Sequence, residues 1–167
     1  MAALKGKARF IEVAFSDESL DSYGFTVKND VSEELGIGGI KSVQSTELYY
    51  LETYPEIGDE RLAEMAEKVF TDPLVQKFSV NENIFPEFDF FIEVKFHEDV
   101  TDNAGIVALE GIEDFYGKKF SGRVRTAKRF YFRGNISARE TERIAKELLA
   151  NEVIETFSVV RGKGNGK

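Results

Sequence analysis

The first half of the chain alternates between the hydrophobic spacing of strands and that of helices. Over residues 10–15 one face of an extended chain is wholly apolar, which predicts a half-buried strand. Over 20–35 apolar side chains recur at helical spacing, and the glycines from Gly36 onward stop the predicted helix. A long strand is predicted over about 40–53.

A second helix is predicted to begin near Gly58 and to end before Pro73. Its apolar side chains recur at i, i+3, i+4, i+7 and i+8, the spacing of an amphipathic helix. Residues 75–80 then predict a third strand. The first half therefore has the order strand, helix, strand, helix, strand.

The second half has the same order of patterns. Residues 90–96 predict a strand, 101–116 a helix that Gly117 ends, and 123–132 a long strand. A capping box at Ser137–Glu140 predicts the start of the last helix.

The two halves also share sequence. Phe10–Phe15 recurs as Phe91–Phe96 and 43–51 aligns with 124–132, both at an offset of 81, while 70–80 aligns with 149–159 at an offset of 79. Three matches in the same order indicate a duplication. We predict a first repeat over 1–86, a second over 87–160 and a disordered tail over 161–167. The predicted fold is α+β: a tandem β-α-β-α-β module forming a two-layer α/β sandwich with a mainly antiparallel sheet.

Composition narrows the chemistry. The 167 residues contain no cysteine, which excludes disulfides, thiolate nucleophiles and cysteine metal sites. No stretch approaches the roughly 18 apolar residues of a membrane span, and the first ten residues do not form a signal peptide. We expect a cytoplasmic protein that does not bind membranes. A pI near 4.9 argues against a dedicated nucleic-acid module.

Candidate catalytic residues are few. His97 is the only histidine, and no acid at a motif spacing would orient it. Glu12 and Glu93 hold equivalent strand positions and should face away from the helices, solvated or at an interface. Asp99, Asp102 and Asp114 lack metal-ligand spacing and are expected to be solvated. Gly36–Gly39 follows a helix, whereas phosphate-binding loops follow a strand. We therefore predict no catalytic residue, cofactor or metal site in this chain.

The densest basic run, over 118–133, is interleaved with aromatic residues and sits in the long second-repeat strand. Strand alternation places Val124, Phe130 and Phe132 on one face. The opposite face and its expected acidic partner supply the candidate interface residues: Arg123, Arg125, Arg129, Tyr131 and Glu12.

Charge suggests how this candidate interface could be used. Residues 1–87 carry 8 Lys/Arg and 17 Asp/Glu, whereas 88–167 carry 14 and 13, so the first half is the acidic one. We expect Arg125 and Arg129 to meet acidic residues of the first repeat, such as Glu12, or to dock a partner subunit. Lys128, on the helix-facing side by parity, should lie near the strand's end or extend past the core.

Two segments resemble a known family. Val124-Arg125-Thr126-Ala127-Lys128 resembles the Val-Arg-x-Gly-Lys pattern of the PurS family, with alanine for glycine, and 148–155 resembles its Leu-Ala-Asn-Pro-Val-Ile-Glu segment. The first repeat keeps Pro73 but has Gln44 and Glu47 in place of the arginine and lysine. The tandem form is similar to the N-terminal region of large, single-chain phosphoribosylformylglycinamidine (FGAM) synthases.

The resemblance implies a function. PurS is the small, non-catalytic component of FGAM synthase in purine biosynthesis, which joins the ATP-using synthetase to the glutaminase and supports ammonia transfer. It implies these synthetase and glutaminase subunits or domains as partners, no cofactor, and a monomer or a dimer of tandems. The alternatives are a small-molecule-sensing regulatory α/β module, an independent enzyme and a nucleic-acid-binding protein.

Overall fold

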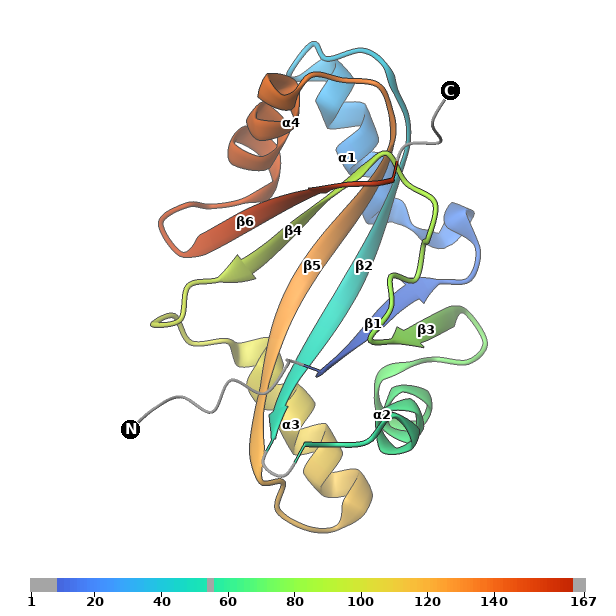
Figure 1. Ribbon diagram of the computed structural model, residues 1–167, viewed down its shortest axis with the longest axis vertical. Coiled ribbons are helices and arrows are strands. Elements are labelled where there is room, and N and C mark those ends of the chain that lie inside the picture. The colour runs from blue at the N-terminus through green and yellow to red at the C-terminus, as the bar shows by residue number, and fades with distance from the viewer. Residues whose placement is uncertain (1–8, 54–55, 164–167) are drawn as a thin grey trace. The chain divides into compact units, whose positions relative to one another are not determined.

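The computed structural model describes residues 9–53 and 56–163, and both halves contain the predicted order of elements (Figure 1). The first repeat consists of β1 (Arg9–Phe15), α1 (Ser22–Glu33), β2 (Ile40–Thr53), α2 (Asp59–Met65) and β3 (Gln76–Val80). The second consists of β4 (Phe90–Phe96), α3 (Asn103–Tyr116), β5 (Gly122–Gly134), α4 (Ala138–Ile144) and β6 (Glu155–Arg161). In both repeats the last helix continues as a π-helical turn, Ala66–Phe70 after α2 and Ala145–Leu149 after α4.

The strands form one six-stranded sheet in the order β3-β1-β2-β5-β4-β6. β1 runs antiparallel to β2 and β3, and β4 runs antiparallel to β6. This arrangement confirms the predicted α+β fold of two β-α-β-α-β modules. β3 and β6, which occupy equivalent places in the two repeats, are the edges of the sheet.

The end of β6 differs from the sequence prediction of a tail from residue 161. Arg161 is the last residue of β6, and the Gly162 N–H donates to the Asp89 carbonyl at 2.9 Å. The β-branched pair Val159 and Val160 favours continued pairing up to this point. Residues 164–167, the rest of the predicted tail, lie outside the described residues.

The chain folds into two compact units that do not follow the repeat boundary. The first unit holds β1, β3, α2 and α3, with β2 from Glu47 onward and β5 up to Ala127. The second unit holds α1, α4, β4 and β6, with the remaining parts of β2 and β5. The first helix of each repeat therefore belongs to the unit that contains the outer strands of the other repeat.

The core of the second unit mixes both repeats. Val27 and Val31 of α1 pack in one cluster with Phe90 and Ile92 of β4 and Phe130 of β5. Phe90 also stacks on Phe132, with ring centroids 4.6 Å apart. Burying each such side chain contributes about 1.5–3 kcal/mol, so a large part of this core depends on the helix from the opposite repeat.

The core of the first unit has the reciprocal composition. Ala108 and Ile112 of α3 cluster with Ile11 of β1 and with Leu62 and Met65 of α2. The apolar stripe predicted for α2 is thus confirmed as a core face. Neither core is complete without residues from both repeats.

A buried aspartate fixes α1 to β2, the middle strand of its own repeat. Asp21 caps α1 by accepting the Gly24 N–H at 2.8 Å, and it also accepts the Ser45 N–H and hydroxyl from β2 at 2.5 Å each. Gly24 allows this close approach, because a Cβ there would lie 2.6 Å from the Val43 carbonyl oxygen. The cap and the glycine together set the distance between helix and strand.

The second repeat reproduces this contact in the first unit. Asp102 accepts the Gly105 N–H at 2.7 Å and the Thr126 N–H at 2.6 Å, and a Cβ on Gly105 would lie 2.3 Å from the Val124 carbonyl oxygen. Asp102 is only 7% exposed, so the sequence prediction of a solvated carboxylate is wrong. The missed signal is the Asp-x-x-Gly spacing, which occurs at Asp21 and Asp102 and is followed after 24 residues by a hydroxyl side chain.

We predict that Gly105→Ala lowers the free energy of unfolding by about 1–3 kcal/mol, because the methyl group meets backbone that cannot rotate away. Gly58→Ala is the matched control, since a Cβ at Gly58 has no atom within 4 Å among the described residues. Urea titrations followed by circular dichroism measure both. Equal stability of the two variants would contradict the close helix–strand approach.

We also predict that cutting the chain between the repeats does not separate them. A protease site inserted between Pro86 and Glu87 and then cleaved should yield fragments that co-elute in native size-exclusion chromatography, because each core needs both repeats. The fragments should separate only in denaturant. Two fragments that elute apart, each soluble and folded, would show that the repeats fold independently.

Candidate functional site

Three polar side chains from β4 and β5 are buried together in the second unit: Glu93, Arg129 and Tyr131, which are 8%, 4% and 3% exposed. Arg129 and Tyr131 belong to the opposite strand parity from Phe130 and Phe132, which lie in the core with α1 and α4. The predicted alternation of β5 is therefore confirmed for these core residues.

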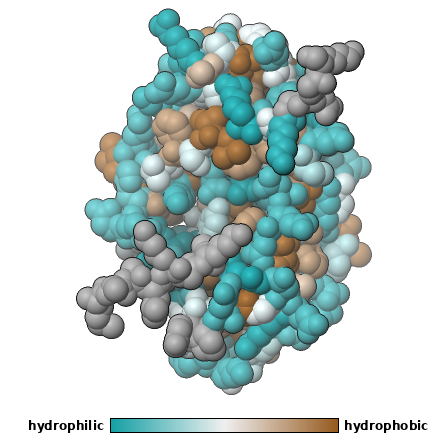
Figure 2. All heavy atoms as spheres, viewed as in Figure 1, coloured by the Kyte–Doolittle hydropathy of each residue, from teal (hydrophilic) through white to brown (hydrophobic). Residues whose placement is uncertain are grey.

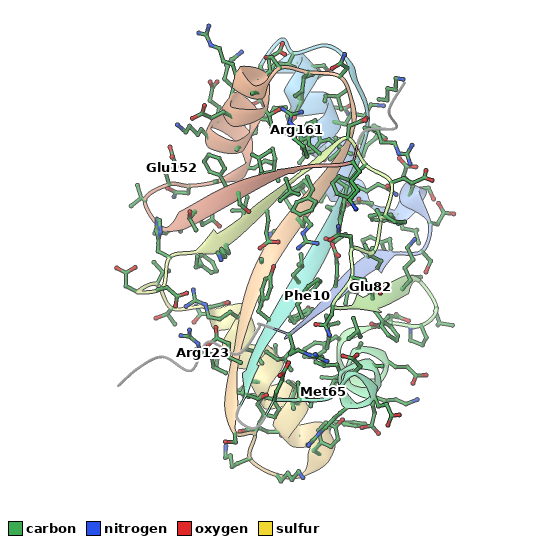
Figure 3. All side chains as sticks on the ribbon, in the orientation of Figure 1. Phe10, Met65, Glu82, Arg123, Glu152 and Arg161 are labelled. Atoms are coloured by element: carbon green, nitrogen blue, oxygen red, sulfur yellow. The ribbon has the colours of Figure 1, made fainter. Side chains whose placement is uncertain are left out.

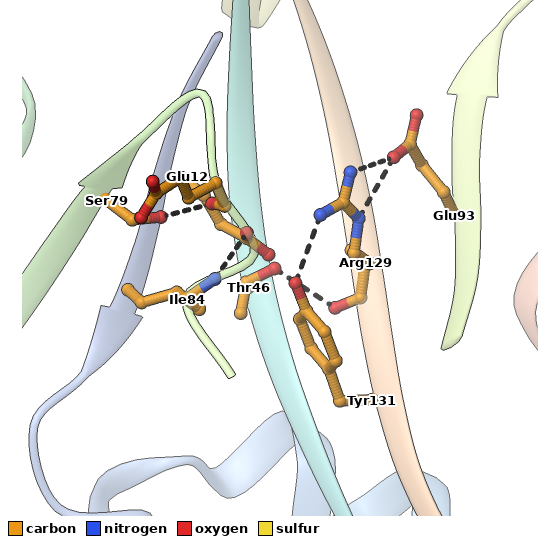
Figure 4. A network of polar contacts seen from close by, with 8 residues as sticks. Glu12, Thr46, Ser79, Ile84, Glu93, Arg129 and Tyr131 are labelled. Atoms are coloured by element: carbon orange, nitrogen blue, oxygen red, sulfur yellow. Dashed lines mark hydrogen bonds and ion pairs between the residues drawn. The ribbon is translucent and has the colours of Figure 1, made fainter. Parts of the chain in front are cut away.

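The arginine binds both neighbours (Figure 4). Its Nε and Nη2 donate to the same Glu93 carboxylate oxygen, Oε2, at 3.0 and 2.7 Å, and its Nη1 donates to the Tyr131 hydroxyl at 3.0 Å. The guanidinium also lies 4.3 Å from the centroid of the Phe91 ring. The Thr46 hydroxyl donates to the Arg129 carbonyl at 3.4 Å.

Two phenylalanines at the junction of the repeats, Phe85 and Phe88, pack their rings against this site. Phe85 and Phe88 meet the Tyr131 ring edge-on, with centroids 5.2 and 5.4 Å away. Edge-to-face contacts of this kind add about 0.5–1.5 kcal/mol beyond the buried area. The arginine and the glutamate are thus held among aromatic rings, where each charge depends strongly on its partner.

The equivalent position in the first unit is built differently. Glu12, equivalent to Glu93, is fully buried, and its Oε2 accepts the Ile84 N–H at 3.0 Å (Figure 4). Leu48 stands where the second repeat has Arg129. The aromatic pair is kept, since Phe10 and Tyr50 have centroids 5.6 Å apart and Phe91 and Tyr131 5.4 Å.

The candidate interface residues from the sequence therefore divide into two groups. Glu12, Arg129 and Tyr131 are buried within this chain, and Arg129 pairs with Glu93 of its own repeat. The reason is that residues 84–88 cover strand positions that the sequence alone leaves open: Ile84 binds Glu12, and Phe85 and Phe88 pack on Tyr131. Glu12 and Glu93 are consequently not the solvated carboxylates that were one expectation for them.

Arg123 and Arg125 form the second group. The Arg123 side chain is 50% exposed, and its Nε donates to Glu52 at 2.6 Å (Figure 3 labels Arg123). Arg125 is half-buried. Lys128 is exposed and extends over the Tyr23 ring of α1, 5.0 Å from its centroid, which agrees with the prediction that it reaches past the core.

The remaining candidate residues show structural contacts. A His97 ring nitrogen lies 3.1 Å from the Glu152 carbonyl oxygen, at the turn before β6. Burial, with the Glu47 carboxylate next to it, raises the pKa of Tyr49 well above its usual range, so this phenol stays protonated.

Over residues 9–53 and 56–163 no group of three or more His, Cys, Asp or Glu side chains could hold a metal ion. Within the same ranges no helix is long and apolar enough to cross a membrane.

The partner of Arg129 was not apparent from sequence. Glu93 has the right parity, but only the pairing of strands shows which residue of the neighbouring strand lies beside the guanidinium. A buried arginine flanked by Phe130 and Tyr131 is a signal that some carboxylate must be near, since an unpaired buried charge is strongly destabilising.

We predict that Arg129→Leu and Glu93→Gln each lower the free energy of unfolding by about 3–5 kcal/mol, because each leaves a buried group without its partner. Leucine is a fair replacement, since the first repeat has Leu48 at this position. The double variant should lose less than the sum of the two single losses, which a double-mutant cycle by chemical denaturation measures. Strictly additive losses would mean that the two side chains do not depend on each other.

A comparison with curated protein sequences finds no match. The model of the PurS family, described as phosphoribosylformylglycinamidine (FGAM) synthase, matches residues 9–83 and again residues 89–162. The two matches cover both repeats and most of the chain, which therefore belongs to the PurS family as a tandem duplicate.

Proposed function

We propose that this chain is the non-catalytic bridging component of FGAM synthase, joining the synthetase to the glutaminase and supporting ammonia transfer between them. The observation that carries the proposal is the double family match. Membership in the PurS family implies a component of FGAM synthase in purine biosynthesis. The bridging role is our proposal beyond this family membership.

The polar groups of the chain favour a structural role. Arg129 binds both Glu93 and Tyr131, and Asp21 and Asp102 bind backbone amides of the helices and middle strands. These are contacts that hold elements in place. The sequence contains no cysteine that could act as a nucleophile, and only one histidine that could act as a general base.

A bridge contributes to such a reaction by proximity. The glutaminase releases ammonia and the synthetase uses it at an amide activated by ATP, so the two sites must exchange a small, diffusible nucleophile. Holding the two catalytic components together raises the effective concentration of one at the other. A component that binds both can therefore increase the glutamine-dependent rate without touching either reacting group.

We take exposed apolar side chains as candidate contacts for these partners. Leu74 and Val153, in equivalent turns before the last strand of each repeat, are 88% and 84% exposed. Phe25 of α1 and Val107 of α3 are 66% and 65% exposed. Figure 2 shows brown, hydrophobic atoms in several separate groups on a face that is otherwise mainly teal and hydrophilic. Large exposed apolar side chains are typical of docking surfaces when they gather into patches. The candidate docking residues Arg123 and Arg125 add positive charge.

Reconstitution tests the proposal. The purified chain alone should turn over neither ATP nor glutamine. Mixed with the synthetase and the glutaminase, it should restore FGAM formation from glutamine, while synthesis from added ammonium salts should proceed without it. Glutamine-dependent synthesis at the same rate without the chain, or ATP turnover by the chain alone, would overturn the proposal.

The basic candidates can be tested separately. We expect Arg123→Ala/Arg125→Ala to weaken binding to the synthetase or glutaminase, chiefly by slowing association, because charges at the rim of an interface act mostly on the association rate. Arg143→Ala/Lys146→Ala is the control, since these two cations on α4 and the turn after it are exposed and paired with carboxylates, as Arg123 is with Glu52. Biolayer interferometry at two salt concentrations measures both. Equal association rates for the two double variants would exclude Arg123 and Arg125 from docking.

A further inference from the structure

The two edge strands of the sheet are equivalent in the duplication but differ in length. β3 has five residues and ends at Val80, after which Asn81 turns the chain with a φ of 57°. β6 has seven residues, because Val160 and Arg161 continue the strand past the equivalent point. Figure 3 labels Arg161 at one end of β6 and Glu152, in the preceding turn, near the other.

The edges also differ in protection. Lys77 is the second residue of β3, and a lysine on an edge strand is a common device against pairing with another chain, whereas β6 has Thr156 at the equivalent position. From Thr156 to Val160 the β6 strand has no charged residue. Val159 and Val160 are 38% and 41% exposed. β6 therefore has the features of an edge that accepts a further strand.

The hydrogen bonds to β4 show which backbone groups of β6 point outward. The Gly162 N–H donates to Asp89 at 2.9 Å, and the His97 N–H donates to the Ile154 carbonyl at 3.0 Å, both in the register of the β4–β6 pair. Even-numbered residues of β6 therefore direct their amides toward β4. Because the direction alternates along an antiparallel ladder, the amides and carbonyls of Phe157 and Val159 point away from β4.

The charges of β6 are complementary to those of a second β6 strand that runs in the opposite direction, because the strand begins with Glu155 and ends with Arg161. When two copies of Glu155–Arg161 are placed antiparallel about a two-fold axis at Ser158, Glu155 of each lies opposite Arg161 of the other. Phe157 then lies opposite Val159, and these are the residues whose backbone groups point outward. Both ends pair opposite charges, and the middle pairs apolar side chains. We propose that the chain forms a two-fold dimer by antiparallel pairing of β6 with β6 of a second copy.

Neighbouring registers lose this match. Moving the axis to Val159 puts Phe157 opposite Arg161, and moving it to Phe157 puts Glu155 opposite Val159. The existing contacts of the charged side chains are compatible with pairing. Glu155 accepts the Asn151 N–H at 2.8 Å, and Arg161 donates to the Thr141 hydroxyl at 2.9 Å. A carboxylate has about four lone-pair sites and a guanidinium five N–H donors, so each keeps capacity for a partner.

The strand pair is short, so the dimer should form at high protein concentration rather than persist on dilution. Sedimentation velocity over a range of concentrations should show a reversible monomer–dimer equilibrium. This dimer would need only copies of this chain and is independent of the proposed function.

Charge exchange tests the register. Glu155→Arg places two arginines opposite each other and Arg161→Glu places two glutamates, so each variant should weaken the dimer at least about tenfold. An equimolar mixture of the two variants pairs opposite charges at both ends and should form heterodimers. The double variant Glu155→Arg/Arg161→Glu should dimerise like the original chain. Gln76→Arg, at the equivalent position of β3, should leave the dimer unchanged.

A backbone variant tests strand pairing itself. Val159→Pro removes an N–H that points outward and leaves the ladder to β4 intact, so it should abolish the dimer and keep the circular dichroism spectrum. The proposal is overturned if the original chain stays monomeric at all concentrations. It is also overturned if the single variants dimerise normally, if their mixture forms no heterodimer although both fold, or if Gln76→Arg disrupts the dimer as strongly as Glu155→Arg.

Discussion

The packing of α1 and α3 into cores built with the outer strands of the opposite repeat is the interaction on which the fold depends. Val27 and Val31 pack in a cluster that includes strands of the second repeat, and Ala108 and Ile112 pack in a cluster that includes elements of the first. A module of about 80 residues buries a thin core by itself. Here two such modules complete each other, and the aspartate caps at Asp21 and Asp102 set how closely each helix meets its middle strand.

Duplication within one chain allowed the two repeats to differ at equivalent positions. The second repeat buries Arg129 against Glu93, while the first has Leu48 and gives its glutamate a backbone amide instead. In a dimer of identical modules both copies of this position would carry the same residue. Buried ion pairs seldom add net stability over apolar packing, but they penalise arrangements that leave a charge unpaired. The arginine in the second repeat alone therefore distinguishes two repeats that are otherwise similar in sequence and element order.

Periodicity and repetition predicted the element order well, because both depend on local patterns. The bounds of β2 and β4 and the capping box at Ser137 followed directly from the sequence. Burial on the other face of the sheet could not be predicted, since it depends on the path of residues 84–88, whose backbone and rings cover Glu12 and Tyr131. Strand parity assigned Arg129 to the correct face but could not show that a connecting segment covers it.

The composition of the two cores also bears on synthesis of the chain. A ribosome adds about 5–20 residues per second, so several seconds separate the emergence of α1 from that of β4 and β5. Throughout this time Val27 and Val31 have no native partners from the second repeat, and their apolar face is open to other nascent chains and to chaperones. Cotranslational folding of the first repeat is therefore incomplete, because the core around α1 also needs residues of the second repeat. Its final packing is a late event that waits for the C-terminal half of the polypeptide.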